Sequence, residues 1–287
     1  MTDLLLLGYG TIGRDLERLL RPELERGELR IIGALVRDPS KRRDESPDFP
    51  LIQAEHFATA VTDADVVVEC AGVAAAREYG PQAIGADRDL VLASVGALAD
   101  PIARLGMLSG PGSLTVTNGA IGGFDLLGAA AQAGGLDDVS IRTAKLASAL
   151  VQPWMGDAER ERLEALAPGD EAVEVFAGSP DEAIAKFPAN VNIAVALAWA
   201  TRELLPADAP AKARSDALGR ALDRVRVSLL ADPDATLSSH RILASGPAGD
   251  YELRLRNAPS PSNPRTSGLT AMSVARDLRE LLARRGA

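Results

Sequence analysis

The feature that most constrains this chain is a glycine cluster directly after its first apolar run. Residues 4–7 are leucines, residues 8–13 read Gly-Tyr-Gly-Thr-Ile-Gly, and leucines then recur at helical spacing to position 24. This order predicts a buried strand that leads into a helix. In a dinucleotide-binding crossover such glycines form the tight turn, admit the pyrophosphate and let the helix pack on the strand. An ordinary glycine-rich turn is the alternative. The residues expected to bind the nucleotide are Gly8, Gly10, Thr11, Ile12 and Gly13.

The first part of the chain alternates strand-like runs with helical patterns. The predicted strands are residues 30–36, 65–71, 90–95 and 114–117, and the predicted helices are residues 55–61, 73–86 and 99–108. This rhythm predicts a parallel, doubly wound sheet, so we expect an α/β fold with an N-terminal Rossmann dinucleotide-binding domain at residues 1–119. Ligands of such sheets bind beyond the carboxyl ends of the strands. Cys70 and Ala71 should therefore line the cofactor crevice.

The rhythm changes after a second glycine-rich segment at residues 118–123. Predicted strands now follow one another with fewer helices, at residues 139–145, 173–176, 225–230, 240–244 and 251–255. This pattern predicts a C-terminal α+β domain with a mixed or antiparallel sheet at residues 120–267. Residues 206–222, rich in alanine, proline and charge, indicate an excursion or linker. Residues 268–287 predict an amphipathic C-terminal helix that returns to the first domain.

The end of the second predicted strand normally decides between NAD and NADP. An acidic residue there accepts hydrogen bonds from the adenosine ribose, whereas an arginine suits a 2′-phosphate. The chain has Arg37 followed by Asp38, with Lys41 and Arg42 close behind. The sequence therefore predicts NAD or NADP as cofactor, with a lean towards NADP, and a charged surface turn is the alternative for each residue.

Charge and cysteine content exclude several kinds of partner. The formal net charge of −9 argues against nucleic acid and anionic membranes, which need a basic surface. No signal-like or membrane-spanning apolar segment is visible. A single cysteine rules out an intrachain disulfide and makes a structural zinc site implausible. We expect a cytoplasmic protein without a metal, in which Cys70 is a buried, inert thiol.

Histidine is the side chain best suited to move a proton near neutral pH, and the chain has two. His56 opens a short predicted helix, where we expect a surface role. His240 starts a predicted strand after a polar turn, and a side chain there can project into a cleft between domains. The residues alone leave both a catalytic and a structural role open for His240.

Polar residues at two predicted helix starts are further candidates. Asn190 and Asn192 lie at the start of a helix predicted at residues 192–204, and Thr266 precedes the last helix. Each can cap its helix or bind a ligand. Two cations, Lys145 and Arg265, can pair with a carboxylate, although solvated surface charge is the simpler explanation for either. The candidate substrate-binding residues are Lys145, Asn192, Arg265 and Thr266.

Eight motifs occur in an order that is similar to the L-aspartate dehydrogenase family. They span residues 4 to about 275, and the later ones are more specific than the glycine cluster. They lie at residues 8–13, 68–71 (Val-Glu-Cys-Ala), 94–98 (Ser-Val-Gly-Ala-Leu), 119–123 (Gly-Ala-Ile-Gly-Gly), 187–192 (Phe-Pro-Ala-Asn-Val-Asn), 231–233 (Ala-Asp-Pro), 240–242 (His-Arg-Ile) and 263–267 (Asn-Pro-Arg-Thr-Ser).

The resemblance implies a homodimeric, NAD(P)-dependent enzyme that oxidises the amine of L-aspartate. The product, iminoaspartate, hydrolyses to oxaloacetate and ammonia or feeds NAD biosynthesis. The resemblance also implies that His240 is catalytic, and that Ala120, through its backbone, and Asn190 contact the cofactor.

Two departures from the family pattern leave the substrate open. Lys145 is followed by Leu146 and Ala147, where family members commonly carry two prolines, and Ser238 stands where an asparagine precedes the histidine. The alternatives are an NAD(P)-dependent dehydrogenase or reductase of another small amino or keto acid, and a protein that senses NAD(P) without turnover.

Overall fold

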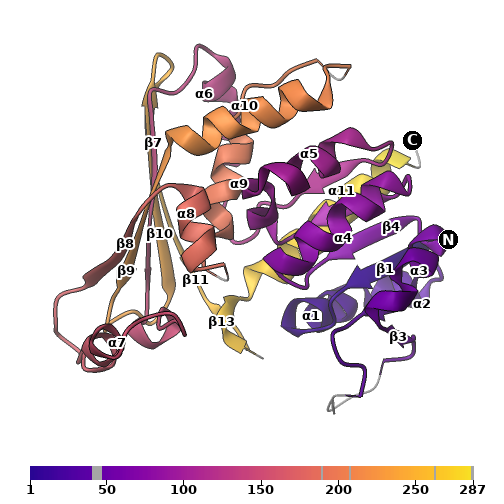
Figure 1. Cartoon of the computed structure of the whole chain (residues 1–287), viewed down its shortest axis with the longest axis horizontal. Helices are drawn as coiled ribbons and strands as arrows, with labels where there is room; N and C mark the ends of the chain where they lie inside the picture. The colour runs from indigo at the N-terminus through magenta and orange to yellow at the C-terminus, as the bar shows by residue number, and fades with distance from the viewer. Residues whose placement is uncertain (41–46, 189, 207, 262, 286–287) are drawn as a thin grey trace. The chain divides into compact units, whose positions relative to one another are not determined.

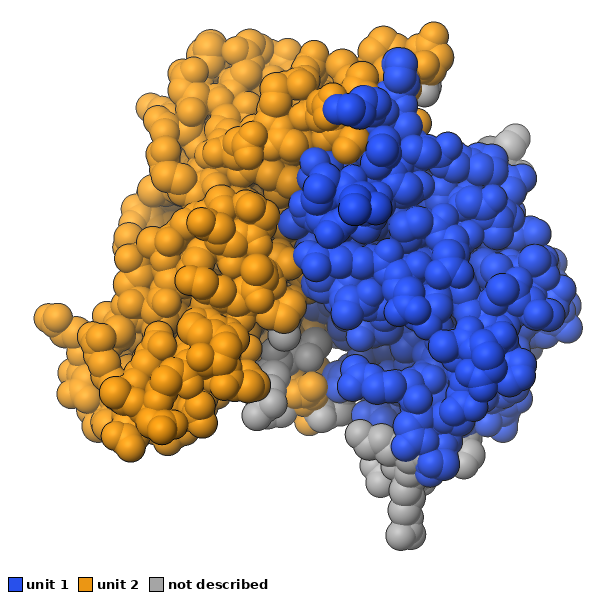
Figure 2. All heavy atoms as spheres, viewed as in Figure 1, with its two compact units in different colours: residues 1–119, 210–212, 270–287 blue, residues 120–209, 213–269 orange. Residues whose placement is uncertain are grey.

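The computed structural model describes residues 1–40, 47–188, 190–206, 208–261 and 263–285, except for the side chains of residues 264–266. The chain forms two compact units (Figures 1 and 2). Unit 1 comprises Met1–Gly119, Pro210–Lys212 and Thr270–Ala287, and unit 2 comprises Ala120–Ala209 and Ala213–Leu269. That unit 1 serves the cofactor and unit 2 the substrate stays a prediction.

Unit 1 is built on a parallel sheet, as the alternating sequence pattern predicts. Within the described residues it has six strands in the order β3-β2-β1-β4-β5-β6. All five neighbouring pairs are parallel. β3 was not predicted, because it has only two residues after a polar loop. The strands are β1 (Thr2–Leu7), β2 (Leu29–Leu35), β3 (Leu51–Ile52), β4 (Val66–Glu69), β5 (Asp89–Leu92) and β6 (Leu114–Val116).

Both faces of this sheet are covered, because residues 4–7 of β1 point alternately to the two sides and all four are fully buried. Leu4 and Leu6 of β1 share a core with Leu16 of α1 and with Val274 and Leu278 of α11. The helix predicted after the glycine cluster is broken in two near Pro22, which has no N–H to continue a helix. The helical segments are α1 (Thr11–Leu19), α2 (Arg21–Glu25), η1 (Ala54–His56), α3 (Phe57–Asp63), α4 (Val73–Gly85), η2 (Val95–Ala99), α5 (Pro101–Ser109) and α11 (Leu269–Arg285).

Unit 2 contains the predicted mixed sheet. Its five strands, counted over the described residues, run in the order β11-β10-β7-β9-β8. β7 and β9 are parallel, and the other neighbours are antiparallel. A separate two-stranded sheet pairs β12 with β13. The strands are β7 (Asp138–Lys145), β8 (Val173–Gly178), β9 (Val225–Ala231), β10 (Ser238–Gly246), β11 (Gly249–Asn257), β12 (Pro259–Ser260) and β13 (Asn263–Ser267).

The helices of unit 2 lie on one side of the five-stranded sheet. Figure 1 shows α6, α8, α9 and α10 on that side, and no helix among the described residues covers the other. Burial alternates accordingly along β9, where Val227 and Leu229 are buried and Arg226 is exposed. The helical segments are α6 (Phe124–Gln132), η3 (Ala147–Ala149), α7 (Asp157–Glu164), α8 (Pro180–Lys186), α9 (Asn192–Ala200) and α10 (Ala211–Arg224).

Two segment predictions in this part of the chain were wrong. Residues 206–222 are not a linker, because most of them belong to α10, which buries Ala217, Leu218 and Leu222. Residues 263–267 form strand β13 instead of simply opening the last helix. Ser267 lies just before that helix, and its Oγ accepts a 3.3 Å hydrogen bond from the N–H of Leu269. Across the described parts of the chain, no helix is both long and apolar enough to cross a membrane.

Truncating the buried face of α10 should destabilise the protein. Leu218 is fully buried, so Leu218→Ala should lower the free energy of unfolding by about 2–4 kcal/mol through lost burial and a residual cavity. Asp223→Ala, at an exposed position of the same helix, is the control and should change it by less than about 0.5 kcal/mol. Urea unfolding measures both. Equal effects from the two variants would mean that α10 is not a packed part of the core.

Candidate active site

The glycine cluster in unit 1 is required by close packing at two of its three glycines. A Cβ on Gly8 would lie 2.7 Å from the Cα of Ala71, and Gly8 has a φ of +97°, which side chains rarely adopt. A Cβ on Gly13 would lie 2.7 Å from the carbonyl oxygen of Gly8. At Gly10, by contrast, a Cβ would meet nothing within 4 Å. The first and third glycines thus bring β1, α1 and the end of β4 together, and the second leaves open space.

That open space lies where an anion is favoured. Helix α1 begins after Gly10 without a side-chain cap. A helix N-terminus carries partial positive charge and donors that suit a phosphate. The geometry therefore fits a dinucleotide pyrophosphate at the positions predicted from the sequence, Gly8 to Gly13.

A buried carboxylate holds the adjoining turns in unit 1. Glu69 is fully buried at the end of β4. Its Oε1 accepts hydrogen bonds from the N–H groups of Ala71 (2.8 Å) and Gly72 (3.0 Å), and its Oε2 accepts one from Ser94 (2.7 Å). Burial raises the pKa of Glu69, although these donors favour the ionised form. Glu69 received no role of its own from the sequence analysis. An acidic residue inside an apolar strand is the signal that could have identified it.

Cys70 is an inert packing residue, as predicted. Its thiol donates to the carbonyl oxygen of Gly8 at 3.1 Å, and burial, reinforced by the negative charge of Glu69, raises its pKa. Its neighbour Ala71 is exposed. A cofactor contact by either residue stays a prediction.

The residues predicted to choose between NAD and NADP are exposed after β2. Asp38 Oδ1 accepts hydrogen bonds from the backbone N–H and the hydroxyl of Ser40, at 2.9 and 2.6 Å. Arg37 is exposed beside it. Lys41 and Arg42 lie outside the described residues. The choice between the two cofactors therefore stays open.

His240 is a buried histidine in the middle of the unit 2 sheet, not at its surface. It is only 5% exposed. It lies opposite Thr143 of β7 and Leu255 of β11. Its Nδ1 is 3.0 Å from the hydroxyl of Thr143. Burial, reinforced by the positive charge of Lys145, lowers the pKa of His240 to about 4, so the imidazole is neutral at pH 7. The other histidine, His56, is exposed, as predicted.

Lys145 brings a cation into the same part of unit 2. It lies two residues beyond Thr143 on β7, on the same face of the strand. Its Nζ donates to Oδ1 of Asn190 at 2.9 Å. Burial lowers the pKa of Lys145 to about 8. Lys145 is therefore mostly protonated at pH 7 but can release its proton within a mildly alkaline range.

The contact with Lys145 changes the interpretation of Asn190. No side-chain hydrogen bond caps helix α9, which begins at Asn192 after Val191. The amide oxygen of Asn190 instead accepts from Lys145. The capping alternative for Asn190 was wrong, because a cation distant in sequence provides its partner. The structure thus brings together His240, Lys145 and Asn190, and adds Thr143, which sequence reasoning missed.

The remaining candidates lie elsewhere in unit 2. Ala120 is buried, and its carbonyl oxygen accepts a 2.7 Å hydrogen bond from the side-chain amide of Asn257 at the end of β11. This partner, 137 positions away, has no local sequence signal. Arg265 and Thr266 belong to β13, but their side chains lie outside the described ones. Among the residues that the structure describes, no group of three or more His, Cys, Asp or Glu could hold a metal ion.

The buried imidazole should make stability fall in acid. The unfolded histidine has a pKa of about 6.5 and the folded one about 4, so between these values only the unfolded state gains the proton. This histidine should therefore remove about 3 kcal/mol of unfolding free energy as the pH falls from 6.5 to 4. His240→Gln should lack this loss, whereas His56→Gln, at the exposed histidine, should behave as the wild type. Denaturant unfolding at several pH values measures it, and identical slopes for His240→Gln and wild type would contradict it.

Comparisons with protein families divide the chain near its second glycine-rich segment, at residues 118–123. The model described as "Homoserine dehydrogenase, NAD binding domain" matches residues 8–109. The model described as "Aspartate dehydrogenase, C-terminal" matches residues 125–281, more than half of the chain. The first match contains the glycine cluster, and the second contains His240, Lys145 and Asn190.

Individual relatives match over almost the full length. The L-aspartate dehydrogenase of Cupriavidus necator is 34% identical over 281 residues, which cover 95% of each chain. That of Pseudomonas aeruginosa is 32% identical and covers 97% of each chain. A crystal structure of aspartate dehydrogenase from Thermotoga maritima superposes with a TM-score of 0.67 at 24% identity, covering 98% of this chain and 97% of that one. It has the same fold, and on the sequence matches the chain belongs to the L-aspartate dehydrogenase family.

Proposed function

We propose that this protein is an NAD(P)-dependent dehydrogenase that oxidatively deaminates L-aspartate. The observation that carries the proposal is the group formed by buried His240 and half-buried Lys145 and Asn190, inside a segment that matches the C-terminal domain of aspartate dehydrogenase. In the overall reaction L-aspartate, NAD(P)⁺ and water give oxaloacetate, ammonium, NAD(P)H and a proton. The intermediate iminoaspartate can alternatively leave to feed NAD biosynthesis.

Unit 1 is proposed to hold the cofactor. The match to an NAD-binding domain and the open space at Gly10 support this role. Gly8 to Gly13 would hold the pyrophosphate, Arg37 and Asp38 the adenosine end, and Cys70 and Ala71 would line the rest. Ala120 and Asn190, which belong to unit 2, are the further cofactor contacts that the family resemblance implies. When bound, NAD⁺ or NADP⁺ supplies the hydride acceptor, nicotinamide C4. The residues of the chain must then orient the substrate so that the Cα hydrogen faces that atom.

His240 is proposed to move the proton in the hydrolytic step. Loss of hydride from Cα leaves an iminium carbon, and a water molecule adds to it. A neutral imidazole can take the proton of that water and return it to the departing amine as a general base and acid. The depressed pKa of His240 supports this role, because the side chain stays unprotonated at neutral pH.

Lys145 is proposed to bind a substrate carboxylate. Lys145 is half-buried, and a charge that is partly removed from water gains from an ionised partner. Asn190 holds the lysine in place through its amide oxygen. Asn192, Arg265 and Thr266 are proposed as further substrate-binding residues.

The single, buried thiol of Cys70 fits a reducing compartment and supports a cytoplasmic location.

Formation of reduced nicotinamide, followed by absorbance, tests the proposed reaction. Purified protein is given L-aspartate, its D-enantiomer and a panel of other small amino acids, each with NAD⁺ or NADP⁺. Turnover selective for L-aspartate is expected, and His240→Ala should lower kcat about 100-fold or more while leaving cofactor affinity within twofold. Cofactor binding without turnover of L-aspartate would contradict the proposal and favour another amino or keto acid, or an NAD(P) sensor. Leu146, Ala147 and Ser238 would then be the first residues to examine.

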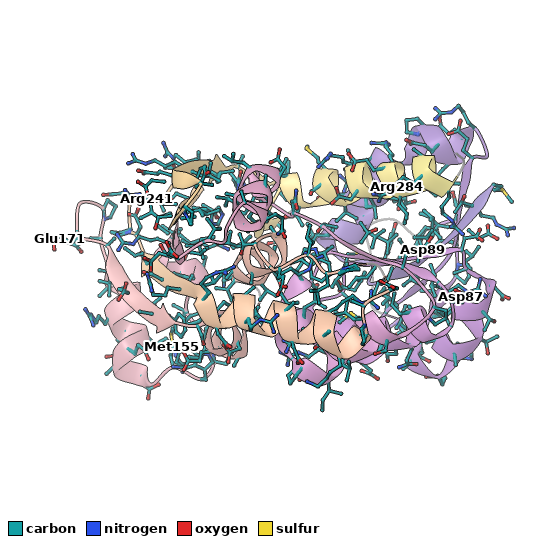
Figure 3. All side chains as sticks on the ribbon, turned by 90° about the horizontal axis from the view of Figure 1, so that it is seen from above. Asp87, Asp89, Met155, Glu171, Arg241 and Arg284 are labelled. Carbon is teal, nitrogen blue, oxygen red and sulfur yellow. The ribbon has the colours of Figure 1, made fainter. Side chains whose placement is uncertain are left out.

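We further propose that the protein works as a homodimer, as its family resemblance implies. The uncovered side of the unit 2 sheet supports this. Arg142 and Arg241 lie directly opposite on neighbouring strands, and Arg254 follows Arg241 on the next (Arg241 is labelled in Figure 3). Like charges in such cross-strand positions destabilise a sheet. Glu252, which pairs with Arg241 and Arg254, shows that acidic groups also lie on this face, so a two-fold related copy could neutralise its arginines.

The oligomeric state in solution tests this proposal. Leu243 is 40% exposed beside a hollow of about 320 Å³ on the same face. The wild type should have the mass of a dimer by light scattering, and Leu243→Glu should shift it to a monomer. Ile102→Glu, at an 82% exposed residue of unit 1, is the control and should remain dimeric. A monomeric wild type would overturn the dimer, and a dimeric Leu243→Glu would exclude this face.

A further inference from the structure

The side chains of Thr143 and His240 form a buried polar contact between the paired strands β7 and β10. Thr143 is 2% exposed and His240 is 5% exposed. They face each other directly across the antiparallel β7–β10 pair, and Nδ1 of the imidazole is 3.0 Å from the threonine hydroxyl. Threonine is branched at Cβ, which restricts its side-chain rotation within a strand. The hydroxyl is therefore fixed relative to one edge of the imidazole.

The hydroxyl partner matters because a neutral imidazole has a single N–H. The hydrogen bond at one ring nitrogen decides which nitrogen carries the proton. A hydroxyl can either donate or accept, so a 3.0 Å contact is compatible with both tautomers. The proton on Nδ1 leaves Nε2 with a free lone pair. The proton on Nε2 leaves that nitrogen unable to act as a base.

Burial, reinforced by the positive charge of Lys145, keeps the imidazole from holding both protons. Lys145 is the titratable group whose charge acts on His240. On the other side of His240, the neighbouring residue on β11 is the apolar Leu255. With the doubly protonated form disfavoured, the reaction depends on which neutral tautomer the pocket selects. Proton transfer from water requires Nε2 to be free, because Nδ1 is already engaged by Thr143.

We propose that Thr143 is a positioning residue: its hydroxyl accepts a hydrogen bond from Nδ1–H of His240 and so presents Nε2 as the proton acceptor of the reaction. The inference rests on the proposed function, because it assigns the base that the hydrolytic step needs. It differs from a purely structural role, in which the hydroxyl would only satisfy a buried nitrogen in either tautomer.

Nitrogen-15 NMR of the imidazole tests the tautomer without any turnover. In wild-type protein at pH 7, His240 should show a protonated Nδ1 and an unprotonated Nε2, with His240→Gln used to assign the signals. Thr143→Val, which keeps the shape but removes the acceptor, should shift the signals towards the other tautomer or a mixture. A wild-type His240 with its proton on Nε2 would overturn the proposal, and this result is independent of whether L-aspartate is the substrate.

Steady-state kinetics tests the functional consequence. Thr143→Val should lower kcat with L-aspartate about 10- to 100-fold, as expected for a misplaced general base, while KM and cofactor affinity change less than twofold. Thr143→Ser retains the hydroxyl and should restore kcat to within about threefold of wild type. An unchanged kcat in Thr143→Val, or a Thr143→Ser variant as slow as Thr143→Val, would overturn the role.

A matched control separates this effect from the general cost of losing a buried hydroxyl. Thr201 is 1% exposed in the same unit, and its hydroxyl donates to the carbonyl oxygen of Leu197 at 2.8 Å. Thr201→Val should lose stability without a fall in kcat. Should Thr143→Val fail to fold, the wild-type tautomer and Thr143→Ser still decide the question. If the wild-type protein has the expected tautomer but does not turn over L-aspartate, the proposed function is rejected and the assignment of the proton to Nδ1 stands.

Discussion

The buried carboxylate of Glu69 organises the carboxyl edge of the parallel sheet. An ionised carboxylate inside a protein is costly unless donors surround it, and here three backbone N–H groups from two turns point at one side chain. These bonds place Ala71 against Gly8, where no side chain larger than hydrogen fits on the glycine. The same contact region therefore fixes the turn before α1 and the turn after β4. A nucleotide site at this edge would therefore be kept rigid by Glu69, although Glu69 need not contact the ligand.

Unit 2 uses burial in a different way: it lowers the pKa of two basic groups, whereas burial in unit 1 raises the pKa of one carboxyl group. Burial lowers the pKa of both His240 and Lys145, and the lysine charge lowers that of the histidine further. The outcome at neutral pH is an uncharged base beside a cation, an arrangement that suits a dianionic substrate and a proton transfer from water. Each group has a hydrogen-bond partner within unit 2, Thr143 for the histidine and Asn190 for the lysine, which orients it.

Local patterns in the sequence were enough to predict most of the architecture. The leucine run, the glycines and the change of rhythm near residue 120 correspond to β1, α1 and the mixed sheet. The helix α10 was missed, because its buried face of two leucines, two alanines and a serine is interrupted by charges and follows two prolines. Strand β13 was missed because proline and polar residues there resemble a helix start, and pairing with the short β12 overrides that local preference.

Site residues could be predicted from the sequence only where the residue type itself indicates a function. His240 and Lys145 stand out as a histidine and a cation near strand ends. Thr143 and Asn257 do not, because their importance comes from partners 97 and 137 positions away. Asn190 shows the same limit: its position before a helix suggested a cap, and a partner 45 positions away took its amide oxygen instead.

The packing around Cys70 has a practical consequence for experiments on this chain. Its thiol is enclosed between β4 and the Gly8 turn, bonded to a carbonyl oxygen and held protonated. Thiol-directed reagents attack the thiolate, so the native protein should be nearly silent towards them. A cysteine introduced at any exposed position would then be the one reactive thiol. Fluorophores or spin labels could be attached there without first replacing a native residue, and without disturbing the glycine turn that the native cysteine supports.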